Sequence, residues 1–368
     1  MKSLQTKRSN INDCRLIDVP SPLCDEGQVR VAVERFSFTA NNITYAVAGD
    51  FEGLSYWRFF PCVDENGDDA SQEWGHIPVW GFANVTKSKS EVLDVGDRLF
   101  GYFPTAQELI IKAVSGHGKN VIDTSSHRAD LPPFYNVYHL VDALNDRAIQ
   151  VDNERSLLYP LFRTGYALSD FLQSKKWMEA DQVIIVSASS KTSLGMAYAV
   201  RQNDNVPTVV GLTSTANVQS VTEINLYDEV VDYAEIENLD SSKSCVIVDM
   251  SGNQSVISRL HTHFNDNMLF NLNVGITHWQ DAAPLEAAGI IVERSEMFFA
   301  PGHIQEMLQR MGEQQFYEKS QQFLTDAAMK TRSWLKMREL DSLSGLASMY
   351  EDAFTGKIAA DQGIIIVC

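Results

Sequence analysis

The sequence of 368 residues is poor in cysteine, in basic residues and in long apolar runs, and each shortage excludes a class of protein. Its 5 cysteines are scattered and form no Cys-x-x-Cys pair, so we expect neither a disulfide framework nor a structural zinc site. A net charge of −18 argues against nucleic acid or an anionic membrane surface as a general partner. No apolar run approaches the roughly 18 residues that a membrane-spanning helix needs.

The remaining bulk properties are those of a globular protein. Residues 1–14 include basic side chains but no apolar segment of the kind that a secretory signal carries. Together with the cysteine usage, this leads us to expect a cytoplasmic protein. The hydrophobic content of 44% is ordinary, and the length exceeds the usual size of one core, so two domains are expected.

The first part of the chain is predicted to be rich in β-structure. In QVRVAVERFSF (28–38), apolar and polar residues alternate, as in a half-buried strand. Further strands are predicted at 79–88, 97–103 and 107–114, with Gly and Asp marking turns between them. Residues 61–78 are polar, acidic and aperiodic, which predicts a long surface loop.

From about residue 155 the pattern changes to strands and helices in strict alternation. This alternation predicts a parallel sheet with helices on both faces, the doubly wound Rossmann architecture. The predicted strands are 183–188, 208–212, 229–233, 245–250, 268–275 and 289–293, and the predicted helices are 159–174, 190–203, 215–225 and 254–264. A helical region is predicted at 301–337, followed by a short helix, a turn at Gly356 and a terminal strand.

Two segments place small polar residues directly after a buried strand. VIIVSASSKTSLG (183–195) runs from a strand into a helix whose N-terminus is suited to a phosphate, and CVIVDMSGN (245–253) repeats the design. Ligands of open α/β sheets bind at such strand ends, although Ser251 or Asn253 can equally cap the next helix. The predicted cofactor-binding residues here are Ser187, Ser189, Ser190, Lys191, Thr192, Asp249, Ser251, Gly252 and Asn253.

The glycine fingerprint of dinucleotide-binding domains is altered in this chain. Serines stand where the first two glycines of GxGxxG make the tight turn, and Gly195 is the only glycine nearby. Serine is small and its hydroxyl can donate to phosphate. The alternative is a degenerate domain that has lost its cofactor.

The end of the second strand bears on the choice of cofactor. NAD-binding units place an acid there to hold the ribose 2′-hydroxyl, whereas here Thr213 and Ser214 follow the apolar stretch. Hydroxyls accept a 2′-phosphate, and Lys191 would add positive charge, so NADPH is the predicted cofactor. The alternative for Lys191 is a solvated lysine at the start of a helix.

Several segments, in order and at suitable spacing, resemble the medium-chain dehydrogenase/reductase superfamily. They are FTANNITYAVAGD (38–50), GFANVTKSKSEVLDVGDRLFGYFP (81–104), VIIVSASSKTSLGMAYAV (183–200) and YEDAFTGKIAADQGIIIV (350–367). More closely, SASSKTSLG, VDMSGN and VGITHW resemble a poorly characterised subfamily defined only as a domain of unknown function. The resemblance implies a chaperonin-10-like (GroES-like) β-rich catalytic domain at 1–155 and 338–368, and a Rossmann domain at 156–337.

The resemblance is to the zinc-free, quinone and enoyl reductase-like branch. The NNITY segment has no Cys, and His76 in GHIP is not followed by Glu, so no catalytic metal is expected; a zinc site from Cys62 and His76 stays an alternative. In that branch a Tyr or Asn near the end of the second strand of the first domain faces the nicotinamide, which points to Tyr45 and Asn42 as catalytic residues. Thr164 lies in the helix that leads to the cleft, and the resemblance implies that it binds the cofactor through the nicotinamide amide.

His278 adds a further candidate, because it follows an apolar strand and imidazole has a suitable pKa for proton transfer. The resulting expectation is a zinc-independent, NADPH-dependent oxidoreductase that reduces an activated C=C or C=O of a small organic substrate. The alternatives are a catalytically silent module that keeps the fold for nucleotide binding or regulation, and a non-redox enzyme such as a lyase. A homodimer is usual in that superfamily and is an open expectation here.

Overall fold

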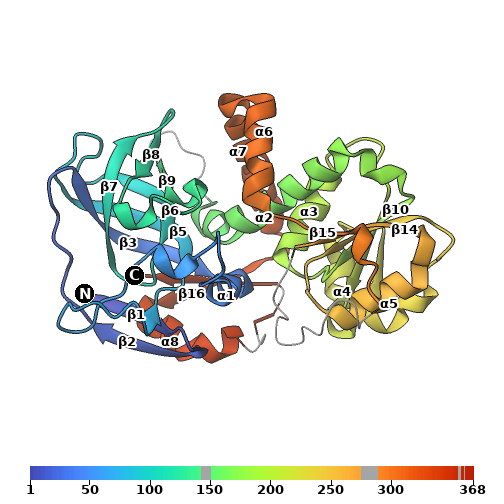
Figure 1. Ribbon diagram of the computed structural model, residues 1–368, viewed down its shortest axis with the longest axis horizontal. Coiled ribbons are helices and arrows are strands. Elements are labelled where there is room, and N and C mark those ends of the chain that lie inside the picture. Colours follow the sequence, from blue (N-terminus) through green and yellow to red (C-terminus); the bar gives the residue numbers. More distant parts are fainter. Residues whose placement is uncertain (142–150, 275–288, 355–357, 360) are drawn as a thin grey trace. The chain divides into compact units, whose positions relative to one another are not determined.

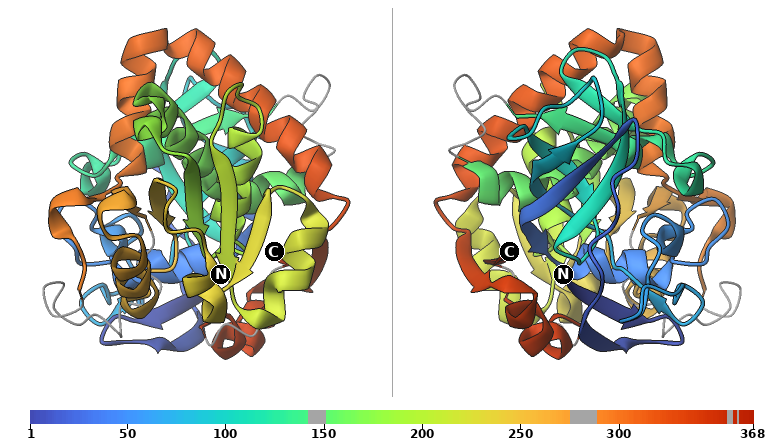
Figure 2. Two further views of the ribbon diagram at one scale, coloured as in Figure 1. Left: turned by 90° about the vertical axis from the view of Figure 1, so that its right-hand side faces the viewer. Right: turned by 90° about the vertical axis from the view of Figure 1, so that its left-hand side faces the viewer.

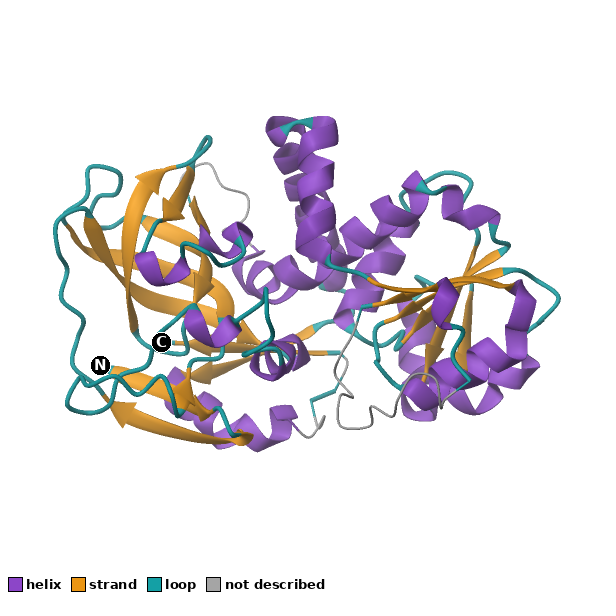
Figure 3. Ribbon diagram, in the orientation of Figure 1, coloured by secondary structure: helices purple, strands orange, loops and turns teal. Residues whose placement is uncertain are grey.

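The computed structural model describes residues 1–141, 151–274, 289–354, 358–359 and 361–368. The chain divides into two compact units, which we call unit 1 (Met1–Tyr159 and Thr331–Cys368) and unit 2 (Pro160–Lys330) (Figure 1). Unit 1 consists mainly of strands, whereas unit 2 alternates strands with helices (Figure 3). The predicted fold class is confirmed. Among the described residues, no helix is both long and apolar enough to cross a membrane.

Unit 1 is built on a closed antiparallel barrel. Its strands pair in the order β3 (Gln28–Phe38), β5 (Val79–Ser88), β6 (Arg98–Phe103), β9 (Val137–Leu140), β8 (Asn120–Asp123) and β7 (Glu108–Ser115), and β7 pairs back with β3. The alternation in β3 gives this strand one buried face, since Val29, Val31 and Val33 all lie in the core. The strands predicted at 28–38 and 79–88 are confirmed residue for residue. The strand predicted at 97–103 begins one residue later, and the one predicted at 107–114 begins and ends one residue later.

The later part of the chain adds two strands to this barrel. β17 (Gln362–Val367) pairs antiparallel with the end of β3, and β16 (Lys336–Asp341) pairs parallel with β17. The helix α8 (Ser342–Phe354) connects them and packs its apolar face on the core. A second sheet, with the order β2 (Asn10–Asp18), β1 (Lys2–Lys7) and β4 (Trp74–Gly75), and the helix α1 (Ala40–Val47) complete the unit. The alternation of residues 2–18 is weak, and the sequence did not predict these strands.

Unit 2 contains a six-stranded, fully parallel sheet (Figure 2). The strand order is β12 (Glu229–Asp232), β11 (Thr208–Thr213), β10 (Gln182–Val186), β13 (Cys245–Asp249), β14 (Met268–Asn273) and β15 (Ser295–Met297). This is the 3-2-1-4-5-6 order of dinucleotide-binding domains. The helices are α2 (Asp152–Ser174, which begins in unit 1), α3 (Lys191–Val200), α4 (Thr215–Ile224), α5 (Gln254–Phe264), α6 (Ala300–Met311) and α7 (Glu313–Thr331).

Two predictions in this region were wrong. Residues 289–293 do not form a strand; a short 3-10 turn at Val292–Arg294 precedes β15, so the strand lies several residues later. The helical region 301–337 is interrupted at Gly312, whose φ of +80° is left-handed, and it ends at Thr331. Residues 336–337 instead begin β16, whose polar sequence KMRELD fits an edge strand. The predicted turn at Gly356 lies outside the described residues.

A buried ion pair holds the segment that follows β8 in unit 1. Arg128 and Asp123 are both fully buried, and Arg128 Nη1 donates to Asp123 Oδ2 at 2.9 Å. The remaining guanidinium donors bind Asn136 Oδ1 at 2.9 Å, Tyr138 Oη at 3.0 Å and the Tyr135 carbonyl at 2.6 Å. Four of the five guanidinium N–H groups are thus hydrogen-bonded, and such bonding is what allows a buried ion pair to be tolerated.

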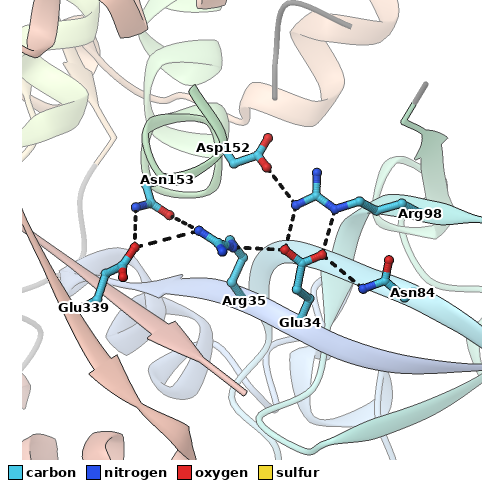
Figure 4. A network of polar contacts seen from close by, with 7 residues as sticks. All are labelled: Glu34, Arg35, Asn84, Arg98, Asp152, Asn153 and Glu339. Carbon is cyan, nitrogen blue, oxygen red and sulfur yellow. Dashed lines mark hydrogen bonds and ion pairs between the residues drawn. The ribbon is translucent and has the colours of Figure 1, made fainter. Parts of the chain in front are cut away.

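A second polar network ties the start of α2 to the barrel (Figure 4). Arg98 Nε and Nη2 donate to the two carboxylate oxygens of Glu34 at 2.7 and 2.8 Å, and Nη2 also donates to Asp152 Oδ2 at 2.7 Å. Arg35 donates to Asn153 Oδ1 at 3.0 Å. The network therefore joins β3, β6 and the first turn of α2, the helix that continues into unit 2.

This network predicts a loss of stability in acid. Burial opposes ionisation of Glu34, but hydrogen bonds from Arg98 and Asn84 outweigh it and lower the pKa of Glu34 below its ordinary value of 4.5. A carboxyl whose pKa is lower in the folded state stabilises the fold above its unfolded pKa. This stabilisation should be lost as the pH falls from about 4.5 through the folded pKa. Urea unfolding between pH 7 and pH 3 should show a shallower loss for Glu34→Gln than for the unmodified protein.

The control for this prediction is Glu339→Gln, because Glu339 lies at the exposed end of the same network and its side chain is 53% accessible. Its acid dependence should match that of the unmodified protein. Burial raises the pKa of Asp152, so protonation of that group acts in the opposite direction. If Glu34→Gln and Glu339→Gln lost the same stability between pH 7 and pH 3, Glu34 would not be the group responsible for the loss in acid.

Candidate functional site

The strand order of unit 2 reverses between β10 and β13, which lie side by side in the middle of the sheet. Their last residues, Val186 and Asp249, are direct partners in the register. The segments that follow, 187–190 and 250–253, therefore leave the sheet at the same edge. This is the topological switch point, where open α/β sheets bind ligands. The structure thus brings the two predicted segments together.

The segment Ser187–Ser190, which we call the serine turn, makes a tight bend directly after β10. Ser187 has a φ of +63°, in the left-handed region that favours glycine. The Ser190 amide donates to the Ser187 carbonyl at 2.8 Å, and the Ala188 amide donates to Leu212 of the next strand at 2.8 Å. The serine turn therefore makes the bend for which dinucleotide-binding domains normally use glycine.

The end of this turn caps the helix α3. Ser190 is the N-cap residue, and its hydroxyl accepts from the Ser193 amide at 3.2 Å. Lys191 and Thr192 occupy the first two helical positions, where backbone N–H groups have no partner within the helix. The N-terminus of a helix attracts anions, so the predicted residues Lys191 and Thr192 lie where a diphosphate can be held.

The end of β11 adds hydroxyl and amide groups beside the serine turn. Thr213 Oγ1 and Asn217 Nδ2 each donate to Ser189 Oγ at 3.3 Å, and Asn217 Nδ2 also donates to Ser214 Oγ at 3.1 Å. Asn217 was not among the predicted residues.

The strand β12, which pairs with β11, ends in Asp232, an acid that the sequence reasoning did not consider. Hydrogen bonds from the Ala234 amide and the Thr215 hydroxyl lower the pKa of Asp232. An ionised carboxylate therefore lies beside the polar groups at the end of β11.

The residues after β13 mainly hold their own turn. Asp249 Oδ1 accepts from the Ser251 amide and hydroxyl, both at 2.7 Å, and Asp249 Oδ2 accepts from the Gly252 amide at 3.1 Å. Gly252 has a φ of +66°, in the left-handed region that favours glycine. Asn253 is the N-cap of α5, with Oδ1 accepting from the Ser255 amide at 3.1 Å. Of the two capping residues considered from the sequence, the structure uses Asn253.

Two tyrosines that the sequence reasoning missed contact the serine turn. Tyr233 Oη accepts from the Ser187 amide at 3.0 Å, and Tyr227 Oη donates to the Ala188 carbonyl at 2.9 Å. Burial, reinforced by the charge of Asp249, raises the pKa of Tyr233 to about 12. Tyr233 therefore lies at the switch point as a neutral phenol. The only available signal was its position directly after the third strand of the sheet.

The predicted residue Thr164 lies on α2, where its hydroxyl donates to the Pro160 carbonyl at 2.9 Å. Close packing fixes this part of α2 against α3. A Cβ added to Gly165 would lie 2.3 Å from the Met196 amide nitrogen, and one added to Gly195 would lie 2.7 Å from the Phe162 ring. Gly195 thus keeps the close-packing role of the third fingerprint glycine, although serines replace the others.

The predicted residues of unit 1 lie on α1. Asn42 is buried and completes the capping box of this helix, since its Oδ1 accepts from the Thr39 amide at 2.7 Å. Its amide group donates to the Pro78 carbonyl at 2.8 Å. The polar atoms of Asn42 are therefore engaged in holding the start of α1, one turn before Tyr45.

Tyr45 lies within a cluster of buried aromatic rings. Its hydroxyl accepts from Trp80 Nε1 at 3.2 Å, and its ring centroid is 4.7 Å from that of Tyr56 and 5.5 Å from that of Tyr102. Burial raises the pKa of Tyr45, while the side chains of Trp80, Asn41 and Tyr102 oppose the shift. The phenol therefore stays protonated at neutral pH, beside donors that can stabilise its anion.

The remaining candidates are His278 and the alternative zinc pair. His278 lies outside the described residues. Cys62 and His76 do lie together, with Sγ 3.4 Å from Nδ1, and Ser3 Oγ is 2.9 Å from His76 Nε2. Within the described part of the chain, no group of three or more His, Cys, Asp or Glu side chains could hold a metal ion. Burial raises the pKa of Cys62 to about 12 and lowers that of His76 to about 4, so both groups are neutral.

A family model described as "Protein of unknown function (DUF2855)" matches residues 36–359. No curated protein matches the sequence. Among solved structures, CurA from Vibrio vulnificus in complex with NADPH has a TM-score of 0.67 at 11% identity, covering 100% of this chain and 99% of that one. The mycobacterial protein Rv1454c complexed with NADPH has a TM-score of 0.57 at 13% identity, with 100% of both chains covered.

The quinone oxidoreductase from Thermus thermophilus, also solved with NADPH, has a TM-score of 0.55 at 13% identity and again 100% coverage of both chains. At such identities the likeness concerns the fold. The architecture predicted from the resemblance to medium-chain dehydrogenases and reductases, a β-rich unit with a Rossmann unit, is thereby confirmed.

Proposed function

We propose that this chain, which belongs to the DUF2855 family of proteins of unknown function, is a zinc-independent, NADPH-dependent reductase. Its substrate would be a small organic molecule with an activated C=C or C=O. The observation that carries the proposal is the switch point of unit 2, where the serine turn leads into the capped start of α3. The NADPH complexes among the structures with this fold support it further.

The residues at the switch point fit a dinucleotide. The first amides of α3, at Lys191 and Thr192, would hold the diphosphate, because a helix N-terminus carries partial positive charge. Thr213, Ser214 and Asn217 would donate to the 2′-phosphate. When bound, NADPH supplies the hydride, and the protein supplies orientation and electrostatics.

In this proposal Tyr45 donates the proton that accompanies reduction. Its high pKa keeps the phenol protonated until a strong base forms on the substrate. The Trp80 N–H, which already donates to Tyr45 Oη, would stabilise the phenolate that remains. Asn42 would position Tyr45 by holding the start of α1.

Titration of the unmodified protein with NADPH and NADH tests the cofactor assignment, with quenching of its 6 tryptophans as the signal. We expect NADPH to bind at least about tenfold more tightly, a difference of about 1.4 kcal/mol. Ser214→Asp should reverse this preference, since it restores the acid that holds a ribose 2′-hydroxyl and repels a phosphate.

Ser220→Asp is the matched control, because Ser220 is exposed further along the same helix. It adds the same charge away from the strand end and should leave the preference for NADPH in place. Failure of the unmodified protein to bind either dinucleotide, or a preference for NADH, would contradict the proposal. Asp232 is the group most able to produce a preference for NADH.

A silent nucleotide-binding module is the second candidate. It is favoured because polar groups at the site are hydrogen-bonded within the protein. The Ser187 amide donates to Tyr233, and Asp249 accepts from the amide of Ser251 in its own turn. Tight binding of NADPH without its oxidation on a panel of enones, quinones and aldehydes would identify this second function.

A further inference from the structure

The serine turn places a side chain where the backbone conformation favours glycine. Ser187 has a φ of +63° and follows a fully buried strand, so the sheet fixes its position. Residues with a Cβ adopt this conformation at a free-energy cost that glycine avoids. Surrounding contacts must therefore hold Ser187, and the structure shows which side chains do so.

Tyr227 holds the turn from beneath. Its hydroxyl donates to the Ala188 carbonyl at 2.9 Å, and its side chain is buried. The ring fits against Gly211 of β11, where an added Cβ would lie 2.8 Å from the ring and 2.9 Å from Ala188 Cβ. Gly211 thus makes room for the Tyr227 ring directly under the serine turn, so this tyrosine is part of its support.

Tyr233 holds Ser187, the residue that precedes Ala188. Its hydroxyl accepts from the Ser187 amide at 3.0 Å, and its own carbonyl accepts from Arg259 Nη1 at 2.8 Å. Arg259 lies on α5 and is paired with Glu237 at 2.6 Å. The backbone of Tyr233 is therefore fixed to the helix that follows β13, and its hydroxyl is fixed to the turn that follows β10.

We propose that Tyr227 and Tyr233 are positioning residues that brace the serine turn in the conformation that presents the start of α3 to a dinucleotide diphosphate. Their hydroxyl bonds support the tight turn that the first glycine of GxGxxG makes without such support. The inference deepens the proposed function and rests on it for the identity of the ligand. The brace itself is a property of the free protein.

Hydroxyl deletions test the brace through the dissociation constant for NADPH. Losing one neutral hydrogen bond should weaken binding about fivefold in Tyr227→Phe and in Tyr233→Phe. Tyr166→Phe is the control, since Tyr166 is a half-buried tyrosine of unit 2 whose ring packs on Phe323. Its dissociation constant should equal that of the unmodified protein.

Rescue separates a brace from a direct contact with the ligand. In the Tyr233→Phe background, Ser187→Gly should restore affinity to within about twofold, because glycine adopts the left-handed conformation without support. If Tyr233 acted only by contacting the dinucleotide, Ser187→Gly would not restore the affinity for NADPH. That result would reject the role of Tyr233 as a support of the serine turn. Tyr227 faces the Ala188 carbonyl, and an unchanged affinity in Tyr227→Phe would likewise overturn its assigned role.

The brace can be tested even if the unmodified protein binds no dinucleotide. That result would defeat the proposed function, and urea unfolding of the free protein would then decide on the brace alone. Tyr233→Phe should lower the unfolding midpoint less in the Ser187→Gly background than in the unmodified background. Equal shifts in the two backgrounds would show that the residues do not act together, and the brace would be rejected.

Discussion

Replacing Tyr45 with Phe should lower kcat for reduction by about 10²- to 10⁴-fold, the range expected when a positioned acid is removed. The dissociation constant for NADPH should change little, because the substitution removes the proton donor and none of the groups proposed to hold the diphosphate or the 2′-phosphate. Phe keeps the ring that packs on Tyr56 and Tyr102. The measurement is single-turnover oxidation of NADPH, with the substrate of the panel that the unmodified protein reduces fastest.

Tyr56→Phe is the matched control for this prediction. Tyr56 belongs to the same buried cluster, but its hydroxyl pairs with Tyr135 at 3.0 Å. It should therefore keep kcat within a few-fold of the unmodified value. If both variants lost activity equally, the cluster would matter as packing and Tyr45 would not be the proton donor. Full activity of Tyr45→Phe would also reject its assigned role.

Replacing Arg128 with Met should lower the free energy of unfolding by about 3–5 kcal/mol, as expected when one partner of a buried ion pair is removed. Met fills a similar volume, so the main loss is the pairing of Asp123, whose carboxylate would stay buried without its cation. The carbonyl of Tyr135 and the side chain of Asn136 would lose donors as well. Urea unfolding at neutral pH measures the change.

Arg58→Met is the control, because Arg58 pairs with Asp130 at 2.8 Å on the surface. An exposed pair of this kind contributes at most about 1 kcal/mol. Adding Asp123→Asn to Arg128→Met should recover part of the loss, since the unpaired charge is then removed. A cost for Arg128→Met no larger than that for Arg58→Met would show that solvent reaches Asp123 in the variant.

The sequence predicted the fold where hydrophobic periodicity was strong. β3 and β5 of unit 1 and the buried strands of unit 2 have regular apolar patterns, and their positions were predicted to within about two residues. The first two residues of β16 were assigned to the end of a helix and the rest of the strand was not predicted, because KMRELD is a polar edge strand with little burial to reveal it. The N-terminal strand β1 was missed for a different reason: it is buried, but three of its buried residues, Ser3, Gln5 and Thr6, are polar and give no apolar alternation.

The candidate site was predictable only in part. Periodicity indicates where a strand ends, so the residues directly after β10, β11 and β13 could be named. Which distant residues share an edge of the sheet depends on the order of its strands, and this order cannot be derived from a single sequence. Tyr227, Tyr233 and Asn217 lie 28 to 46 residues beyond the groups they contact, and no local pattern marks them.

Unit 1 is interrupted in the chain by the whole of unit 2. The far end of β3, at Phe36 and Phe38, must wait for β17, which is made more than 320 residues later. During synthesis on the ribosome, the Rossmann sheet has all its strands before the barrel receives its last partner. The nascent chain therefore carries an open, apolar strand edge through most of translation, the state in which chaperones bind growing polypeptides.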